Sequence, residues 1–440
     1  MTGRAERSLS VVLHTHMPYV EGFGTWPFGE EWLWEAIATC YLPLLDVLEA
    51  HPGAVTVSLT PVLADQLEAP GVAERLLAFL RGVREESHRL DMKAHPEVAS
   101  QLEHSLARYR RAAKDYERRD GDLVAALAPH AAWSSAATHA VLPLLATDAG
   151  VRLQVETGVA AHRARFGGWG GGFWLPECAH APWLDTHLEA AGVAVTCVEL
   201  TGLGLDPRVP LRSAAGPILA PIDRALIDRV WGPAGYPSHG AYLDTHHRTT
   251  RRHLAWAVDG QPYDPQRAAA QVREDAADFA ARVPDGGWTV CALDTELLGH
   301  WWAEGVDWLA AVIEACGRAG VDVRPLDARY GAGAAPAPAL PVTTWGRPRT
   351  LETWSGPRAQ GLAWRQRAAE LRTLSPSERP SPRALRELLA LQASDWAFLV
   401  SEDTAGPYPL ERATAHEAAL EAALAGEGEP ELRNLAPYLA

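Results

Sequence analysis

The amino-acid sequence predicts an α/β fold in which parallel strands form a sheet or barrel. Short apolar runs typical of buried strands alternate with segments of helical periodicity along most of the chain. With 440 residues, 47% of them hydrophobic, the chain can form one large barrel with added domains. Two of the apolar runs end in carboxylates, and the C-terminal ends of barrel strands are where such folds place their reacting groups.

The first half of the chain contains three predicted strands, with a long helical region between the second and the third. The predicted strands cover 8–13, 55–59 and 131–135, and helical periodicity covers 30–50, 63–127 and 143–166. The long helical region is rich in arginine and glutamate and has almost no strand signal. We therefore interpret residues 66–127 as a helical insertion between strands of the barrel.

The second half continues the alternation and then becomes helical. Its predicted strands cover 173–175, 194–198 and 289–293. Glycine, alanine and proline dominate 331–341, a composition typical of linkers. The resulting division is a barrel over 1–65 and 128–330, the insertion over 66–127, a linker over 331–357 and a C-terminal helical domain over 358–440.

The net charge and the cysteines limit the partners and the compartment. A formal charge of −15 and a pI near 5.6 argue against nucleic acid and against an anionic membrane surface, and they suit a neutral polymer. The five cysteines form no CxxC pair and have no zinc-site spacing, which predicts reduced thiols. With no signal peptide and no apolar run of 18 residues, we expect a cytoplasmic protein that is a monomer or a weak homo-oligomer.

Tryptophan is unusually frequent, with 17 residues against seven phenylalanines. Tryptophan rings stack on the apolar faces of sugars while their N–H groups bind polar partners. A high-GC coding bias is the alternative explanation, yet it does not account for tryptophans that lie beside histidines and carboxylates in the sequence. The pattern favours a carbohydrate ligand.

Glu177 lies in the most informative segment of the chain, residues 172–180. It follows an apolar run and Pro176, which restricts the backbone at the turn. An unpaired carboxylate inside a core costs several kcal/mol, so the end of a strand is the better position for this glutamate. As a nucleophile, Glu177 would need hydrogen-bond donors that keep it ionised.

A second strand of the same design ends in Asp294 and Glu296, with His300 and Trp301 following. Two strand-end carboxylates beside aromatic residues are typical of glycoside chemistry, in which one is the nucleophile and the other the acid. The acid needs a raised pKa to hold its proton. From spacing alone either Asp294 or Glu296 can be that acid, and helix capping or salt bridges are the alternative role for these carboxylates.

His14 and His16 come at the end of the first predicted strand, and Pro18 disfavours its continuation. A metal pair, a structural pair and a pair of sugar ligands are the possible roles. Zinc needs a third and usually a fourth ligand, and the sequence has no HExxH motif and no cysteine partner. We therefore predict no metal and no cofactor. His139, which precedes a helical segment, is the candidate third polar group of this site.

Several motifs, in the same order along nearly the whole chain, resemble glycoside hydrolase family 57 and within it the 1,4-α-glucan branching enzymes. The matching segments are 14–20, 26–33, 136–139, 174–179, 294–296 with 299–302, and two further segments at 235–237 and 394–399. Each motif is weak alone, and together they are specific. The resemblance implies an incomplete (β/α)7 barrel with a helical insertion and a C-terminal helical domain that closes over the cleft.

The resemblance also implies roles for individual residues. Glu177 would be the nucleophile that forms a covalent glucosyl-enzyme, and Asp294 would be the general acid/base. An α-1,4-glucan would then be both donor and acceptor, with transfer from an α-1,4 to an α-1,6 linkage. The substrate-binding residues would be His14, His16, His139, Trp174, Tyr236, Trp256, His300, Trp301, Asp395 and Trp396.

The aromatic members of this set have specific expected roles. The family carries a tyrosine on a mobile loop over the site, where it excludes water from the intermediate, and Tyr236 lies where that loop would be. Glycines at 232, 235 and 240 would make the loop mobile, and an ordinary aromatic turn is the alternative. Trp256 and Trp396 would stack on the glucan, the latter from the helical domain.

The chain departs from the family at 351–360, where an expected aspartate is missing, and at His180 and Leu298, which stand where the family usually has aromatic residues. These changes concern the substrate cleft more than the catalytic pair. An α-1,4-glucan hydrolase or a 4-α-glucanotransferase of the same fold is therefore an alternative. A non-catalytic glucan-binding protein is another, although it would not need both Glu177 and Asp294. A metal-dependent deacetylase would require a His/Asp triad that the sequence does not assemble.

Overall fold

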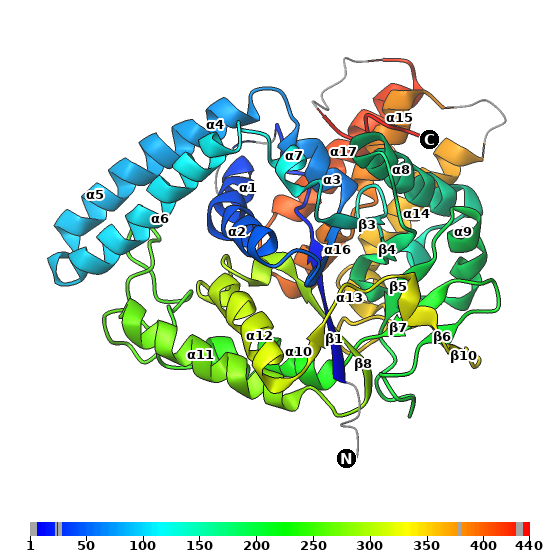
Figure 1. Cartoon of the computed structure of the whole chain (residues 1–440). Helices are drawn as coiled ribbons and strands as arrows, with labels where there is room; N and C mark the ends of the chain where they lie inside the picture. Colours follow the sequence, from blue (N-terminus) through cyan, green and yellow to red (C-terminus); the bar gives the residue numbers. More distant parts are fainter. Residues whose placement is uncertain (1–6, 23, 25–28, 376–379, 428–433) are drawn as a thin grey trace, which may run out of the picture.

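The computed structural model describes residues 7–22, 24, 29–375, 380–427 and 434–440. Predictions for the first six residues, and for positions 26–28 of the 26–33 motif, lie outside this part of the chain. The described residues form a curled sheet surrounded by helices, with an arm of insertion helices on one side and the C-terminal helices on the other (Figure 1).

The sheet has the parallel topology that the alternation of strands and helices predicts. The strands are β1 (Arg7–Thr15), β2 (Val55–Leu59), β3 (Ala131–Ser135), β4 (Gly172–Trp174), β5 (Val195–Val198), β6 (Leu211–Arg212), β7 (Ile218–Pro221), β8 (Gly287–Asp294), β9 (Asp322–Val323) and β10 (Ala335–Pro336). In the described part of the chain, these ten strands form one sheet in the order β10-β6-β7-β5-β4-β3-β2-β1-β8, with β9 beside β1. Apart from the antiparallel pair β6–β7, neighbouring strands are parallel.

The sheet curls until its two ends approach each other. The backbone N–H of Asp223, just after β7, donates to the carbonyl of Val290 in β8 over 2.8 Å. Strands β1 and β2 are buried along their whole length. Parallel strands covered on both faces are continuous apolar runs, which is why the sequence identifies them. The predicted incomplete barrel of parallel strands is confirmed.

The helices of the barrel connect successive strands. They are α1 (Glu30–Ala36), α2 (Leu42–Ala50), α8 (Asp148–Phe166), α9 (Asp185–Ala190), α10 (Arg224–Trp231), α11 (Pro265–Arg282) and α12 (Gly305–Ala319). A π-helical turn joins α1 to α2, so the helix predicted over 30–50 is continuous. The helix predicted from residue 143 begins only at Asp148, because Pro143 belongs to a separate short turn and Thr147 caps α8 through its side chain.

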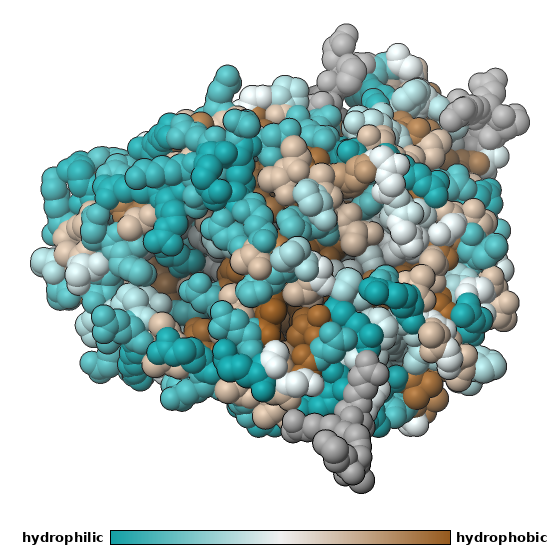
Figure 2. All heavy atoms as spheres, in the orientation of Figure 1, coloured by the Kyte–Doolittle hydropathy of each residue, from teal (hydrophilic) through white to brown (hydrophobic). Residues whose placement is uncertain are grey.

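The insertion between β2 and β3 is helical, as predicted. It contains α3 (Pro61–Leu67), α4 (Val72–Ala78), α5 (Arg84–Ala94), α6 (Ala99–Arg118) and α7 (Leu123–Leu127). Helices α4, α5 and α6 project from the barrel as an arm, and Figure 2 shows that their surface is mostly hydrophilic. Asp91 of α5 is fully buried and pairs with Arg251 at 2.9 Å, which ties this arm to the loop before α11.

The C-terminal region is a separate layer of helices packed on the barrel. It contains α13 (Glu352–Ser355), α14 (Gln360–Leu374), α15 (Pro382–Leu391), α16 (Ser394–Glu402) and α17 (Tyr408–Leu424). The predicted linker, 331–357, includes α13, and before that helix it contributes β10 to the sheet edge and pairs with the barrel through Thr343 and His180. Among the described helices, none combines the length and the apolar character of a membrane span.

Candidate active site

The candidate site lies at the C-terminal ends of β1, β4 and β8. The register of β1 and β8 pairs His14 with Asp294, and Glu177 follows the end of β4. The C-terminal ends of parallel strands lie along one edge of the sheet, and the curl of the sheet turns the ends of β4 and β8 towards each other. The fold therefore brings together two motifs that are more than a hundred residues apart.

The backbone at Glu177 is held in an unusual conformation. Glu177 has φ 59° and Cys178 has φ 49°, in the left-handed region that L-residues rarely adopt. The carbonyl of Glu177 accepts hydrogen bonds from the Thr344 hydroxyl at 2.7 Å and from the backbone N–H of Trp345 at 3.2 Å. Strained backbone persists where surrounding contacts hold it, and it is common at functional sites.

Both carboxylate oxygens of Glu177 have hydrogen-bond donors. The hydroxyl of Ser394 lies 3.1 Å from Oε1, and the indole N–H of Trp345 donates to Oε2 over 3.2 Å. Burial and the charge of Asp294 raise the pKa of Glu177 to about 8, although the hydrogen bonds from Trp345 and Ser394 oppose this rise. The donors thus favour the ionised form that a nucleophile needs, although burial dominates in the free site.

Asp294 and Glu296 have different environments. Asp294 is exposed to water, although surrounding protein raises its pKa to about 6 against the opposing charge of His16. Glu296 is buried and accepts hydrogen bonds from the Tyr41 hydroxyl at 2.6 Å and from the backbone N–H of His16 at 3.2 Å. Glu296 is therefore committed to neighbouring protein groups. The accessible carboxyl is Asp294, which favours Asp294 as the acid that spacing alone left undecided.

The three predicted histidines lie together. His14 and His139 face each other with 2.8 Å between their Nε2 atoms, and the rings of His16 and His139 stack with centroids 4.0 Å apart. Trp174 stacks on His14 at 4.7 Å. Burial, followed by the proximity of His16, lowers the pKa of both His14 and His139 well below the usual range. These two rings are therefore neutral at physiological pH.

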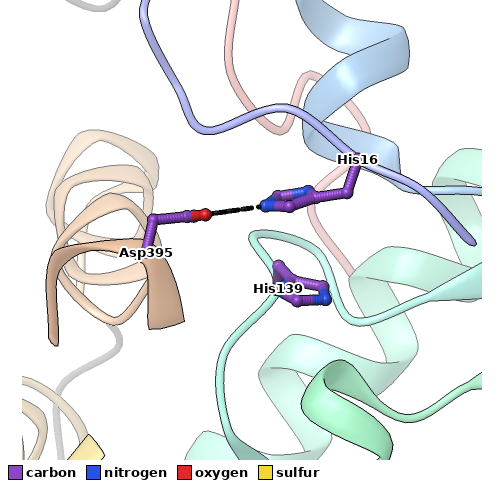
Figure 3. A group of neighbouring side chains, drawn as sticks. All are labelled: His16, His139 and Asp395. Carbon is purple, nitrogen blue, oxygen red and sulfur yellow. Dashed lines mark hydrogen bonds and ion pairs between the residues drawn. The ribbon is translucent and has the colours of Figure 1, made fainter. Parts of the chain in front are cut away.

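His16 differs because the helical domain supplies its counter-charge. Its Nε2 lies 3.0 Å and 3.2 Å from the two carboxylate oxygens of Asp395 in α16. Although burial opposes the charged ring, Asp395, Glu296 and Glu177 raise the pKa of His16. Figure 3 shows Asp395 reaching from its helix to His16, with His139 alongside. Asp395 thus completes the site from a different part of the fold.

His16, His139 and Asp395 also form the kind of triad that the deacetylase alternative requires. Their ligand atoms lie within 4.8 Å of one another. Imidazole ligands bind a metal in the plane of the ring, and stacked rings do not direct their lone pairs to one point. Both nitrogens of His139 already face His14 and Ser394. The geometry is that of a hydrogen-bonded cluster, and the absence of a metal stays a prediction.

Tyr236 does not lie over the site, contrary to our expectation. Its side chain is buried in a short turn, where its hydroxyl donates to Asp278 of α11 over 2.8 Å and its ring packs near Trp302 and Trp308. The aromatic turn that the sequence left as the alternative is what the structure contains. The motif places this tyrosine correctly on a loop, but apolar burial and the acidic partner hold its side chain in the barrel core.

Trp396 does not face a cleft in this structure, and its stacking on glucan stays a prediction. The ring is fully buried among the C-terminal helices, and its N–H donates to the carbonyl of Ala390 over 2.8 Å. Trp256 lies against the insertion, where His247 covers it with ring planes 13° apart. The structure does not bring Trp256 into contact with the carboxylates, and its glucan-binding role stays a prediction.

His300 and Trp301 follow β8 on a tight turn. Gly299 has φ 100°, and a Cβ at this position would lie 2.0 Å from the carbonyl oxygen of Thr39. The turn therefore requires glycine and packs directly on the helix after β1. Trp301 is 45% exposed and lies edge-on to His300. An exposed tryptophan seven residues after Asp294 is available to stack on a sugar, which keeps Trp301 a candidate.

Two residues of the site were not predicted, Ser394 and Trp345. Both contact Glu177 directly. Ser394 begins the 394–399 motif, and its place beside Asp395 was the only signal for it. Trp345 lies in the segment interpreted as a linker, where composition gave no sign of a functional side chain.

Comparison with known proteins agrees with this geometry. Residues 132–323 match the sequence profile of glycosyl hydrolase family 57, and residues 364–431 match the C-terminal profile of 1,4-alpha-glucan branching enzymes. A probable 1,4-alpha-glucan branching enzyme of Mycobacterium tuberculosis is 31% identical in an alignment that covers 92% of this chain and 90% of that protein. The chain belongs to glycosyl hydrolase family 57. A 1,4-alpha-glucan branching enzyme of Thermococcus kodakarensis is 29% identical over 93% of this chain and 72% of that protein.

Solved structures of this family have the same architecture. The GH57-type branching enzyme of Pyrococcus horikoshii superposes with a TM-score of 0.87 at 28% identity, over 93% of this chain and 88% of that one. The GH57 branching enzyme of Thermococcus kodakaraensis, solved with glucose, gives a TM-score of 0.85 at 26% identity, over 99% and 96%. The incomplete (β/α)7 barrel with a C-terminal helical region is therefore confirmed.

Proposed function

We propose that this family 57 protein is a 1,4-α-glucan branching enzyme that works by a retaining mechanism. The observation that carries the proposal is the pair Glu177 and Asp294, which come from the ends of β4 and β8 and are close enough for the charge of Asp294 to raise the pKa of Glu177. Glu177 has hydrogen-bond donors, and Asp294 is accessible to solvent. An α-1,4-glucan is the proposed donor and acceptor. The branching-enzyme relatives at 28–31% identity support transfer to a glucan acceptor over hydrolysis.

In the first step Asp294 gives its proton to the glycosidic oxygen while a Glu177 oxygen forms a bond to C1 of the sugar. The chain beyond the cleaved bond leaves with a free 4-hydroxyl group. In the second step the ionised Asp294 takes the proton from the 6-hydroxyl of an acceptor glucan. That oxygen then bonds to C1 and displaces Glu177, so that an α-1,6 linkage results.

The pair must carry one proton for this chemistry. The pKa values of both carboxyls are raised, that of Glu177 by burial and by the charge of Asp294, and that of Asp294 by the protein around it, so the pair holds a proton near neutral pH. Catalysis needs it on Asp294. Positive charge that develops at C1 favours the carboxylate of Glu177, and the donors Ser394 and Trp345 favour the same state. The pair with one proton in total is therefore the form that enters the reaction, whichever of the two carboxyls holds the proton before the substrate binds.

The proposal is tested by incubating the purified protein with amylose and following anomeric protons by NMR together with reducing ends. New α-1,6 signals with little gain in reducing ends are the expected result. Reducing ends without α-1,6 signals would instead identify a hydrolase. Redistribution of chain lengths with neither change would identify a 4-α-glucanotransferase, and binding without any turnover would identify a glucan-binding protein.

The location and assembly of the protein are also proposals. All five cysteines are free and buried, which supports a reducing compartment such as the cytoplasm. The proposed assembly is a monomer or a weak homo-oligomer that binds neither nucleic acid nor membranes. Sedimentation of the purified protein across a concentration series tests the assembly directly.

A further inference from the structure

A continuous chain of hydrogen bonds leads from Glu177 into the wall of the barrel. Ser394 Oγ lies 3.1 Å from Glu177 Oε1 and 2.8 Å from His139 Nδ1. His139 Nε2 lies 2.8 Å from His14 Nε2, and His14 Nδ1 lies 3.5 Å from the hydroxyl of Ser58. The chain thus connects a helix of the C-terminal domain to two loops and two strands of the barrel.

The chemistry of its members permits only two arrangements of the protons. The Ser394 hydroxyl has one proton, so when it donates to an ionised Glu177 it must accept from His139. A neutral His139 that donates from Nδ1 has a free Nε2, which accepts from Nε2–H of His14. All donors then point towards Glu177.

A protonated Glu177 reverses every bond of this chain. The carboxylic acid donates to Ser394, and the hydroxyl of Ser394 donates to Nδ1 of His139. Nε2–H of His139 then donates to His14, which turns its Nδ1–H towards Ser58. Each protonation state of the glutamate therefore corresponds to one tautomer of each histidine, and both rings stay neutral throughout. A hydrogen-bond chain with one consistent direction is more stable than a mixed one.

We propose that Ser394 is a positioning residue which links the ionisation of Glu177 to the tautomers of His139 and His14, so that the C-terminal domain takes part in setting the charge of the nucleophile. The inference rests on the proposed role of Glu177. It extends that role because Ser394 reaches the site only when α16 is docked.

The docking of Ser394 depends on more than its side chain. Ser394 is buried, and its backbone N–H donates to the carbonyl of His139 over 3.1 Å. His139 itself has φ 59°, so its loop is held in a conformation that needs such support. Contacts from backbone and side chain of one residue fix the hydroxyl between Glu177 and His139.

The other charged groups around Glu177 belong to three elements. Asp294 comes from β8, Asp395 from α16, and His16 from the loop after β1, and both aspartates oppose ionisation of Glu177. Ser394 and Trp345 are the donors that oppose this effect. Removing the Ser394 hydroxyl leaves Trp345 in place, so ionisation becomes harder without being abolished.

The test compares Ser394→Ala, Ser394→Thr and wild-type enzyme. For Ser394→Ala we expect kcat on amylose to fall about 10- to 100-fold, KM to change less than threefold, and the alkaline limb of the pH profile to move up by about one pH unit. Ser394→Thr keeps a hydroxyl and should recover most of the activity. Ser401→Ala is the matched control, because Ser401 lies on the same helix and donates to the carbonyl of Thr353, away from the carboxylates.

A second measurement does not depend on activity. In protein labelled with ¹⁵N-histidine, the signals of His14 and His139 should change from one tautomer to the other as Glu177 titrates. This change should be absent in Glu177→Gln and in Ser394→Ala. Tautomers that stay constant over the titration in wild-type protein would overturn the inference, as would an unshifted pH profile in a folded Ser394→Ala. If the wild-type protein does not act on glucans, the proposed function fails, whereas the NMR result still decides the inference.

Discussion

The barrel and the C-terminal helical domain bring their residues to the site in different ways. His14 and Asp294 are paired by the register of two adjacent strands, so backbone hydrogen bonds set their spacing. Ser394 and Asp395 come from the first turn of α16, whose position depends on how side chains pack between the helices and the barrel. The first contribution is built into the sheet, and the second exists only after docking.

Buried polar contacts hold the docked domain. Arg412 of α17 donates to the carbonyl of Tyr19 over 2.8 Å and lies 5.3 Å from the centre of the Trp396 ring. Next to it, His416 and Glu387 pair at 3.0 Å, with both side chains buried. Tyr19 is three residues after His16, so this cluster connects the loop that carries His16 with α16, the helix that carries Asp395. Ser394 and Asp395 therefore reach the site only through the packing of side chains that are not themselves part of it.

The largest effect is expected on the barrel side. Glu177→Gln should lower turnover on amylose by about 10⁴-fold or more, because the amide cannot form the glycosyl-enzyme. Thermal unfolding should change little, since the amide oxygen still accepts a hydrogen bond. Glu402→Gln, at the exposed end of α16, is the control. A loss smaller than tenfold would contradict the nucleophile assignment.

The next largest effect is expected from a substitution that weakens the docking of the C-terminal domain and does not change the strand ends of the barrel. Arg412→Ala should lower the free energy of unfolding by about 3 kcal/mol, because it removes the buried guanidinium that contacts the carbonyl of Tyr19 and the ring of Trp396. Denaturant titration measures this loss, and limited proteolysis of 331–357 reports undocking. Arg372→Ala removes an exposed ion pair with Glu421 in the same domain and should cost less than about 1 kcal/mol. Equal losses in the two variants would show that the buried cluster has no special role.

Asp395→Asn tests the ion pair that spans the two regions. The pKa of His16 is raised in the folded state, so the pair stabilises the protein fully below the unfolded pKa of histidine and loses this contribution as pH rises through the folded value. The substitution should therefore cost about 1.5–3 kcal/mol near pH 6 and clearly less near pH 9. Urea titrations at the two pH values measure the difference. A cost that is independent of pH would mean that His16 is not charged in the pair.

The smallest effect is expected for Tyr236, which is neither one of the strand-end residues of the site nor one of the residues that α16 brings to it. Tyr236→Phe removes its hydrogen bond to Asp278 and should lower the free energy of unfolding by about 1 kcal/mol. The ratio of α-1,6 linkages to reducing ends should stay within about twofold of wild type, because the hydroxyl lies in the core. A marked shift towards hydrolysis would show instead that the loop moves Tyr236 to the site during turnover.

Local patterns predicted the barrel half of the site well. His14, Glu177 and Asp294 each follow an apolar run, and strand ends of a parallel sheet converge whatever their order in the chain. For Tyr236 and Trp396 the motif identifies a residue and its loop or helix, but not the direction of its side chain. Both rings found buried partners that no local pattern encodes.

The parallel α/β fold, the helical insertion and the two carboxylates can be predicted from the sequence alone, because periodicity and strand-end position are local properties. The accessible carboxylate near the end of β8 could be identified only in the folded molecule, since the burial of Glu296 depends on Tyr41 from a distant helix. The folded molecule also shows that Ser394 and Trp345 contact Glu177. Hydrogen bonds between residues far apart in the chain follow from packing, and packing is a property of the whole fold.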